Sequence, residues 1–584
     1  MKHLLKSSFA AVSLATALVV GIAAPLAAQD SPIYSLKDRF QPETAQNGMV
    51  ASQEAVASRV GVDILKKGGN AVDAAIATGF ALAVTLPRAG NLGGGGFMMI
   101  HLADSGDTKA LDYREMAPAA AFKDMFLGED GEPDNQKSRF SGLAVGVPGT
   151  VAGFAEAFEK HGSGKLTWAE LVAPAIGLAE NGIEVTPDLA ASLTASAKRL
   201  LQDPATAAIF YKTGGMPFVP GETLKQTDLA ATLKLIADKG AAGFYTGEVA
   251  EKIAQKVTAS GGGMTTEDMA GYKPVWRDPV VGSYHGYEIA SMPPPSSGGV
   301  HIVQILNMLQ GYPLAEYGPN SADSIHVMAE TMRRAYADRS KYLGDPDFVD
   351  VPVKGLTDPA YAAELVKSIK MDMATPSEEM KPGDPFPYES NQTTHYSVVD
   401  KDGNAVSNTY TLNFSYGVGL TADGTGVLLN NELDDFSAKP GVPNAYGLLG
   451  ADANAIAPGK RMLSSMTPTI VTRDGEPWLV TGSPGGSTII TTTMQVILNS
   501  IDHQMSVNDA VGRPRFHHQW QPDQVWFEPL GLSPDTLSIL RDMGHEMVST
   551  PWGGDIGDAN SIKRVDGEMR AMSDPRNDGG AAAF

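Results

Sequence analysis

The chain has 584 residues, of which 43% are hydrophobic and 19% charged, and it contains no cysteine. This ordinary composition argues against disorder or a fibre, and the length allows roughly two to four domains of about 150 residues, although large layered enzymes depart from that ratio. Without cysteine, disulfides, thiolate catalysis and zinc–thiolate sites are excluded. The formal net charge of −22 makes nucleic acid and anionic lipid poor partners, because like charges repel.

The first residues predict a secretory signal peptide over 1–28. Two lysines precede an apolar run at 9–24, and small residues follow it. Cleavage after Ala27 or Ala28 would release the mature chain into a bacterial periplasm or the medium, without a membrane anchor. An uncleaved anchor is the alternative, but the run is shorter than the ~20 residues that span a bilayer. No later segment is apolar for long enough to do so.

The mature chain begins with helical patterning. Residues 52–86 predict helices with a break at Gly68-Gly69, a new start capped by Asn70 and an end at Pro87. The glycine run that follows fits neither a dinucleotide-binding nor a P-loop spacing, so close backbone packing is the better interpretation. Nucleotide binding is therefore unsupported.

Helices dominate the middle of the sequence and strands appear later. From about 150 to 380, helical stretches such as TVAGFAEAFEKHG and ADSIHVMAETMRRAYADRSKYLG alternate with Pro/Gly turns such as MPPPSSGG. After 393, strands are expected in YSVVDKDGNAVSNTYTL, GVLLNNELDDF and TPTIVTRDGEPWLVTG, followed by a helix in TIITTTMQVILNSI. No internal repeat, low-complexity tract or clear linker is present. This order predicts stacked α and β layers.

Two adjacent threonines stand where a polar run meets the first of these strands, in ESNQTTHYSVVD. The Asp-Gly pair at 402–403, between two alternating runs, predicts a hairpin. When the polar faces of the two strands are matched, Thr393 lies opposite Thr411. Thr411 and Asn413 should then lie beside Thr393.

A threonine hydroxyl becomes a useful nucleophile only when a base removes its proton. His395 shares the predicted face of Thr393, but two residues along a strand is an awkward distance for proton transfer. The α-amine of Thr393 would serve instead if the chain were cut before it, because a terminal amine with a pKa near 7.7 to 8.0 is partly unprotonated at neutral pH. No G-x-S-x-G elbow supports a serine triad. By itself, such a threonine pair is nearly always structural.

Several motifs occur together and in a fixed order: LDYREMAP, NQTTHYSVVDKDGNAV, NNELDDFSAKPGVPNAYG, LSSMTPTIV and TGSPGGSTI. In these motifs, and over essentially the whole mature chain, the sequence closely resembles the gamma-glutamyltransferases, also called gamma-glutamyltranspeptidases or glutathione hydrolases. These are N-terminal-nucleophile hydrolases. The resemblance implies an α+β fold, a four-layer αββα sandwich, and autocleavage between Gln392 and Thr393. The products would be a large subunit, 29–392, and a small subunit, 393–584, which stay together.

The resemblance also implies catalytic roles. Thr393 would be the nucleophile both in precursor cleavage and in the attack on the γ-carbonyl of a glutamyl substrate, and Thr411 would hydrogen-bond it. Gly485 and Gly486 lie between a predicted strand and a predicted helix, where free backbone N–H groups suit a developing oxyanion. A tight turn explains the same two glycines.

A γ-glutamyl group carries an α-carboxylate and an α-ammonium, so a selective pocket needs cationic and anionic partners placed apart. An arginine fork suits the carboxylate. By resemblance, the carboxylate is assigned to Arg114, Ser464 and Ser465, and the ammonium to Asn413, Glu432 and Asp435. Some relatives carry glutamine at position 432. Without the resemblance, Arg114 would be a surface ion-pair residue and ELDD a solvated acidic turn.

Residues 436–450 resemble the family's lid loop over the substrate. Relatives that lack it tend to accept glutaryl groups, so its presence favours γ-glutamyl donors such as glutathione, with water, amino acids or peptides as acceptors. His517-His518 has no partner ligands at metal-binding spacing, and packing is the better interpretation. No metal or organic cofactor is implied. The alternatives are a glutaryl-type cephalosporin acylase of the same fold and, more distantly, an inactive secreted binding protein.

Overall fold

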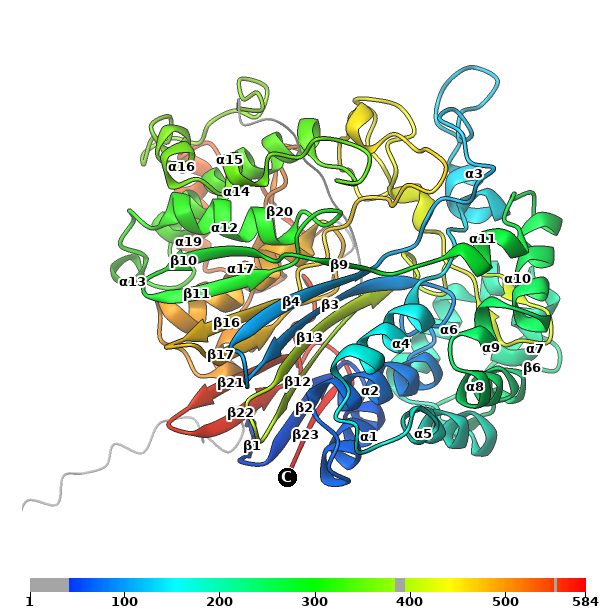
Figure 1. The fold of residues 1–584 in the computed structure, drawn as a ribbon. Helices are drawn as coiled ribbons and strands as arrows, with labels where there is room; N and C mark the ends of the chain where they lie inside the picture. Colours follow the sequence, from blue (N-terminus) through cyan, green and yellow to red (C-terminus); the bar gives the residue numbers. More distant parts are fainter. Residues whose placement is uncertain (1–40, 384–393, 551–553) are drawn as a thin grey trace, which may run out of the picture. The chain divides into compact units, whose positions relative to one another are not determined.

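Two seven-stranded sheets form the centre of the fold (Figure 1). The computed structural model describes residues 41–383, 394–550 and 554–584. The expected signal peptide and both residues of the expected cleavage site, Gln392 and Thr393, lie outside these ranges.

The first sheet contains strands from both halves of the chain. They are β1 (Glu43–Ala45), β10 (Val280–Tyr284), β11 (Tyr287–Ser291), β16 (Thr469–Arg473), β17 (Glu476–Thr481), β21 (Ser561–Val565) and β22 (Glu568–Met572). Their order across the sheet is β1-β22-β21-β17-β16-β11-β10, and the neighbours are antiparallel.

The second sheet is built in the same way. Its strands are β2 (Gly48–Ser52), β3 (Gly95–Leu102), β4 (Asp107–Tyr113), β9 (Val275–Arg277), β12 (Thr394–Asp400), β13 (Ala405–Thr411) and β23 (Gly580–Ala583). The order β23-β2-β12-β13-β3-β4-β9 places β12 in the interior of the sheet, with β2 on one side and β13 on the other.

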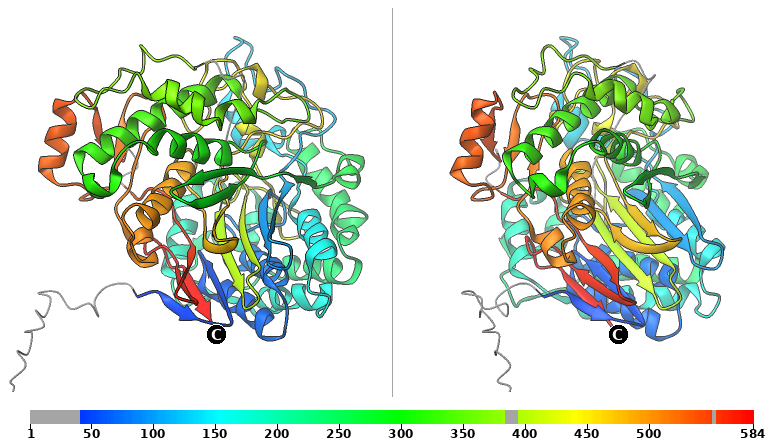
Figure 2. Two further views of the ribbon diagram at one scale, coloured as in Figure 1. Left: turned by 60° about the vertical axis from the view of Figure 1, so that its left-hand side comes forward. Right: turned by 90° about the vertical axis from the view of Figure 1, so that its left-hand side faces the viewer.

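Helices cover the outer face of each sheet (Figures 1 and 2). Against the second sheet lie α1 (Ala55–Lys66), α2 (Ala71–Thr85) and α4 (Thr150–His161), and against the first lie α12 (Gly298–Leu309), α17 (Thr488–Ile501) and α18 (Val507–Gly512). Apolar side chains fill the space between the sheets, among them Phe97, Met99, Ile470 and Val480. All of these layers belong to one unit, 42–584. The expected αββα sandwich is therefore confirmed.

Further helices extend the two outer layers. They are α3 (Asn135–Phe140), α5 (Trp168–Asn181), α6 (Pro187–Leu200), α7 (Pro204–Phe210), α8 (Thr227–Lys239), α9 (Ala242–Tyr245), α10 (Glu248–Ala259), α11 (Thr266–Gly271), α13 (Leu314–Tyr317), α14 (Ala322–Tyr342), α15 (Val353–Leu356), α16 (Pro359–Val366) and α19 (Pro534–Asp542). Short strands complete the set: β5 (Ile183–Glu184), β6 (Tyr211–Lys212), β7 (Met216–Pro217), β8 (Thr223–Leu224), β14 (Thr421–Ala422), β15 (Val427–Leu428), β18 (Phe516–His517), β19 (Val525–Phe527) and β20 (Met547–Ser549).

The second of the first two helices begins and ends where the sequence predicts, whereas α1 begins at Ala55 because residue 52 still belongs to β2. Asn70 caps α2 in a capping box with Asp73, and the helix ends before Leu86, which precedes Pro87. Proline disfavours helical backbone at the preceding residue, which explains the stop. Every residue of α2 is buried, so this helix lies between the second sheet and the outer helices.

The β12–β13 hairpin has the predicted register. His395 pairs with Thr409 and Ser397 with Ser407, the alignment that the matched polar faces predict for the described part of the hairpin. The imidazole of His395 is completely buried between the sheets, where its Nδ1 lies 3.1 Å from Thr409 Oγ1 and its Nε2 lies 3.0 Å from Ser397 Oγ. Burial lowers the pKa of His395 to about 3, so this side chain is neutral and structural.

The prediction of a strand in GVLLNNELDDF is mostly wrong. Only β15 is extended, and the acidic residues form a 3₁₀ turn, η3 (Glu432–Asp435). The reason is the side chain of Asn430, which donates to the carbonyl oxygens of Gly93 and Gly146 at 2.7 and 2.8 Å. Its Oδ1 also accepts from the backbone N–H of Glu432 at 3.1 Å. Side-chain hydrogen bonds thus replace a strand ladder and turn the chain.

Candidate active site

Arg114 follows directly after β4 and is completely buried. Its backbone N–H donates to Asp112 Oδ1 at 3.0 Å. The guanidinium donates from Nη1 to Glu432 Oε2 and from Nη2 to Asp435 Oδ2, each at 2.6 Å. Nε donates to the carbonyl oxygen of Met462 at 3.2 Å. The fork of Arg114 is therefore fully engaged by protein groups.

The charged residues assigned to the two ends of the substrate contact one another, whereas the sequence analysis expects them apart. Glu432 and Asp435 are both buried on η3, and both face Arg114. The physical reason is burial: an unpaired charge away from water is very unfavourable, so opposite charges that are buried together form pairs.

Glu115 adds a third carboxylate that the sequence reasoning missed, although it stands next to Arg114. Its Oε2 lies 3.6 Å from Arg114 Nη1, and its side chain is completely buried. Burial raises the pKa of Glu115 to about 8 and that of Asp435 to about 7, and it raises the pKa of Glu432 well above its ordinary value. Oδ1 of Asp435 receives no hydrogen bond from the described residues. One guanidinium thus faces three carboxyl groups, more than it can neutralise.

Ser464 and Ser465 are buried beside this cluster. They follow Met462 and Leu463, whose carbonyl oxygens accept from Arg114. The N–H of Ser464 donates to the carbonyl oxygen of Pro295 at 2.8 Å, which fixes the segment against the loop before α12. Both serines therefore follow directly after the two carbonyl groups that contact the guanidinium.

Asn413 lies just after the end of β13. It adopts a φ of 71° and donates from Nδ2 to the carbonyl oxygen of Asn431 at 2.9 Å. Its Oδ1 accepts from the hydroxyl of Tyr446 at 2.7 Å. Tyr446, in the lid segment, is a second residue that sequence reasoning did not single out. An aromatic residue with a hydroxyl in a loop of small residues is the signal that could have identified it.

The end of β13 lies beside Arg114. Thr411 pairs with Gly95 of β3, and Tyr113 pairs with the next residue of β3. Thr411 and Arg114 therefore lie at the same end of their neighbouring strands. Oγ1 of Thr411 accepts from the N–H of Asn413 at 2.7 Å. The first described residue of β12, Thr394, pairs with Tyr410, the neighbour of Thr411, so β12 begins at this same end of the sheet.

The glycine turn between β17 and α17 begins next to β12. A Cβ on Gly482 would lie 2.6 Å from His395 Nδ1, so the chain passes directly over that strand. Gly485 and Gly486 follow with φ of 131° and 70°, values that L side chains rarely adopt. Within the described residues, neither N–H donates a hydrogen bond.

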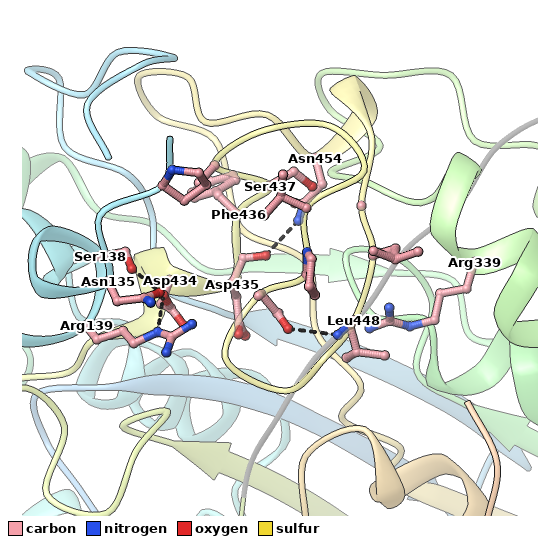
Figure 3. A pocket seen from close by; sticks show the side chains of 17 residues that line it. Asn135, Ser138, Arg139, Arg339, Asp434, Asp435, Phe436, Ser437, Leu448 and Asn454 are labelled. Carbon is pink, nitrogen blue, oxygen red and sulfur yellow. Dashed lines mark hydrogen bonds and ion pairs between the residues drawn. The ribbon is translucent and has the colours of Figure 1, made fainter. Parts of the chain in front are cut away.

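Residues 436–450, the lid segment, line a small cavity together with Asp434 and Asp435 (Figure 3). On one side of a cavity of about 30 Å³, Ser138 and Arg139 contact Asp434, and Arg339 reaches in from α14 on the other side. A cavity of this size has room for little more than water, whereas ligand pockets usually measure ~300 Å³ or more. The described conformation is therefore closed.

His517 and His518 are buried and hydrogen-bonded within the body. His517 lies 2.8 Å from Thr491 Oγ1 and 2.9 Å from Gln519 Oε1, and His518 lies 3.2 Å from Asp523. Among the described residues, no group of three or more His, Asp or Glu side chains is arranged to hold a metal ion.

Two facing sheets between helical layers, with a threonine-led strand in the interior of one sheet, define the N-terminal-nucleophile hydrolase class. The sequence model of the gamma-glutamyltranspeptidase family matches residues 57–584, and the chain belongs to this family. It is 55% identical over 543 residues to the glutathione hydrolase proenzyme of Escherichia coli (strain K12), which covers 93% of this chain and 92% of that protein.

Acylases are also similar. The acylase ACY 1 proenzyme of Pseudomonas sp. (strain V22) is 39% identical over 88% of this chain and 89% of its own length. Among solved structures, the cephalosporin acylase from Bacillus halodurans superposes with a TM-score of 0.83 at 30% identity, covering 95% of this chain and 98% of that chain. The gamma-glutamyltranspeptidase of Helicobacter pylori superposes with a TM-score of 0.56 at 48% identity, and the match covers 57% of this chain and 94% of that chain.

Proposed function

We propose that the chain is the precursor of a gamma-glutamyltransferase that also hydrolyses glutathione, and that it cleaves its own Gln392–Thr393 bond. One observation carries this proposal. Arg114 is completely buried among three carboxylates, at the end of the sheet where Thr411 ends β13. Such a cluster suits a ligand that carries one carboxylate and one ammonium.

Maturation would use the hydroxyl of Thr393. The oxygen attacks the carbonyl carbon of Gln392, the amide nitrogen leaves as the α-amine of Thr393, and an ester joins the two residues. Water then hydrolyses the ester to a free carboxylate on Gln392 and a free hydroxyl on Thr393. Cleavage thereby creates the base that catalysis needs.

In turnover, the α-amine would take the proton of the Thr393 hydroxyl as its oxygen attacks the γ-carbonyl of the donor. The N–H groups of Gly485 and Gly486 would stabilise the oxyanion. The departing amine receives the proton, and a γ-glutamyl ester remains on Thr393. Water releases glutamate from this ester, and an amino acid or peptide releases a transfer product.

Substrate binding would exchange ion pairs. The α-carboxylate of the donor replaces Glu432 and Asp435 on Arg114, and the α-ammonium takes the oxygens that these carboxylates release. Every buried charge keeps a partner during the exchange, which avoids the penalty for an unpaired ion. The lid segment must move to admit the donor, because the cavity beneath it is too small.

We further infer that the mature enzyme is exported to the periplasm, after removal of residues 1–28, as two subunits from one precursor. The signal-like composition of the first residues supports this inference. Over the part of the chain that the structure describes, no helix has the length and apolar character that crossing a membrane requires.

Mass spectrometry of the purified protein tests the proposal. The parent should give two fragments that divide at 392/393, and Thr393→Ala should give one inactive chain. Thr394→Ala, the neighbouring threonine, is the matched control and should still divide. A parent that releases glutamate from γ-glutamyl amides while still uncut would exclude this mechanism.

The close superposition on a cephalosporin acylase favours a second candidate, hydrolysis of glutaryl amides. A glutaryl group lacks the α-ammonium and therefore does not need the excess carboxylates around Arg114. Rates on γ-glutamyl and glutaryl anilides separate the two functions. The charged cluster predicts a preference for γ-glutamyl, and equal rates would favour the acylase.

A further inference from the structure

The chain that leads toward the proposed cleavage site is tied to one side of α14. Thr375 donates to Glu330 from its backbone N at 3.0 Å and from Oγ1 at 2.6 Å. Ser377 N donates to Asp523 Oδ2 at 2.7 Å. Glu330 is buried, and although burial opposes ionisation, neighbouring arginines lower its pKa to about 2, so it accepts as a carboxylate. These contacts fix the segment as far as residue 377.

A separate contact fixes Gly383, the last described residue before the gap. Its N–H donates to Asp338 Oδ1 at 2.7 Å, and its carbonyl oxygen accepts from the Tyr342 hydroxyl at 2.5 Å. The other oxygen of Asp338 accepts from Gln304 Nε2 and from the Tyr361 hydroxyl, both at 2.7 Å. Asp338 is only 1% exposed, and one of its two oxygens accepts from the backbone of Gly383 while the other is held by Gln304 and Tyr361.

The contact also requires glycine. A Cβ at position 383 would lie 2.0 Å from the Tyr361 hydroxyl oxygen, while its next neighbours are 3.1 Å away or more. Gly383 does not adopt a positive φ, so alanine there is excluded by the hydroxyl and not by the backbone. Removal of that single oxygen atom should therefore restore the space.

We propose that Asp338 is a positioning residue for autoprocessing, which acts by fixing Gly383 ahead of the scissile bond. This inference rests on the proposed cleavage at 392/393. Residues 384–392 separate Gly383 from Thr393, a reach of at most about 35 Å when fully extended. Chain entropy changes only slowly with loop length, so the main effect of the anchor is on orientation, to which attack geometry is far more sensitive.

Two substitutions and their combination test the anchor. Gly383→Ala should slow cleavage of the full-length precursor about tenfold, because the methyl group displaces the residue from Asp338. Tyr361→Phe should cleave within about twofold of the parent, since the Asp338–Gly383 bond remains. The double variant should recover most of the parental rate. Cell-free synthesis of the whole chain, sampled over time on a denaturing gel, measures each rate.

The pattern of cleavage rates distinguishes a positioning role of Asp338 from a general loss of stability. A double variant as slow as Gly383→Ala, or a Gly383→Ala variant at the parental rate, would overturn the proposal. Turnover per cleaved molecule should be unchanged in all variants. A parent that stays uncut contradicts the cleavage itself, whereas a dividing parent with an unaffected Gly383→Ala variant contradicts only the anchor.

A second comparison guards against misfolding of the alanine variant. Asp338→Asn keeps the shape of the side chain but weakens the charge-assisted bond to Gly383. Thr375→Ala loosens the same segment at the earlier contact with Glu330. Asp338→Asn should slow cleavage more than Thr375→Ala does, and the reverse order would contradict the proposal.

Discussion

Two buried ion clusters in this molecule use the same residue types in different proportions. Around Arg114, one guanidinium faces three carboxylates. In the second cluster, two arginines face two acids: Asp574 lies 2.6 Å from Arg515 and 3.0 Å from Arg576, and both oxygens of Glu528 lie 2.7 Å from Arg576.

Burial is similar in the two clusters, but the pKa shifts are opposite. Burial opposes ionisation of Asp574 and Glu528, yet the two arginines hold the pKa of each below its ordinary value. Around Arg114, burial dominates and raises the pKa of each carboxylate. The balanced cluster is complete as it stands, whereas the unbalanced one gains a partner when a cation arrives. The cluster around Asp574 therefore stabilises the fold, and the cluster around Arg114 suits ligand binding.

The largest expected effect comes from removing the single cation of the unbalanced cluster. Arg114→Gln should lower kcat/KM for γ-glutamyl substrates about a thousandfold, in line with the ~2–5 kcal/mol that truncating one partner of a buried charge pair costs in binding. Stability should change little, because carboxylates with a pKa near 7 can take up protons. Steady-state kinetics and thermal unfolding measure the two effects. A large fall in Tm with a near-parental kcat/KM would show that the Arg114 cluster stabilises the fold and does not bind the substrate.

The balanced cluster should respond in the opposite way. Asp574→Ala leaves two buried arginines that cannot lose their protons, so the free energy of unfolding should fall by about 3–5 kcal/mol. Turnover per folded molecule should stay near the parental value. Denaturant unfolding measures the loss. Glu568→Ala is the control, because its pair with Arg570 is exposed and should contribute less than ~1 kcal/mol.

The pH dependence of substrate binding sharpens the contrast. Because the pKa of Asp435 is raised to about 7, the empty site takes up a proton as the pH falls through 7, and that proton competes with the substrate ammonium. KM should rise below pH 7 by up to about tenfold per unit for one proton. The same shift means that folding is favoured by protonation of Asp435, and this stabilisation is lost as the pH rises through 7. Asp435→Asn should flatten the KM profile between pH 5.5 and 7.5.

An exposed ion pair over the same site provides the smallest effect. Lys439 of the lid segment lies 2.7 Å from Glu132, and both side chains are at least 40% exposed. Exposed pairs contribute ~0.2–1 kcal/mol, so Lys439→Ala should change KM less than about fivefold. Kinetics at low and high salt test this, because screening should remove the difference. A change as large as that of Arg114→Gln would show that exposure does not govern these contacts.

Local patterns predicted the parts of the fold that depend on neighbouring residues. The Asn70 cap, the β12–β13 register and α17 follow from side chains within a few positions of one another. The turn at η3 did not, because it depends on hydrogen bonds from Asn430 to Gly93 and Gly146, far away in the sequence.

The same limit applies to the site. The resemblance named Arg114 and Asp435, but it gave no indication that the two are in direct contact in the closed conformation. Glu115 was missed because its role depends on complete burial, and Tyr446 was missed because its partner Asn413 lies more than thirty residues away. Neither burial nor distant contacts can be read from local spacing.

The position of β12 has a consequence for the mature enzyme. Cleavage before this strand would leave β12 and β13 of one fragment between β2 and β3 of the other, within a single sheet. The first sheet also mixes strands from both sides of the cut. In the part of the chain that the structure describes, no surface would let the fragments separate intact, so their association would have no dissociation constant apart from the equilibrium of unfolding, and dilution alone should never divide them.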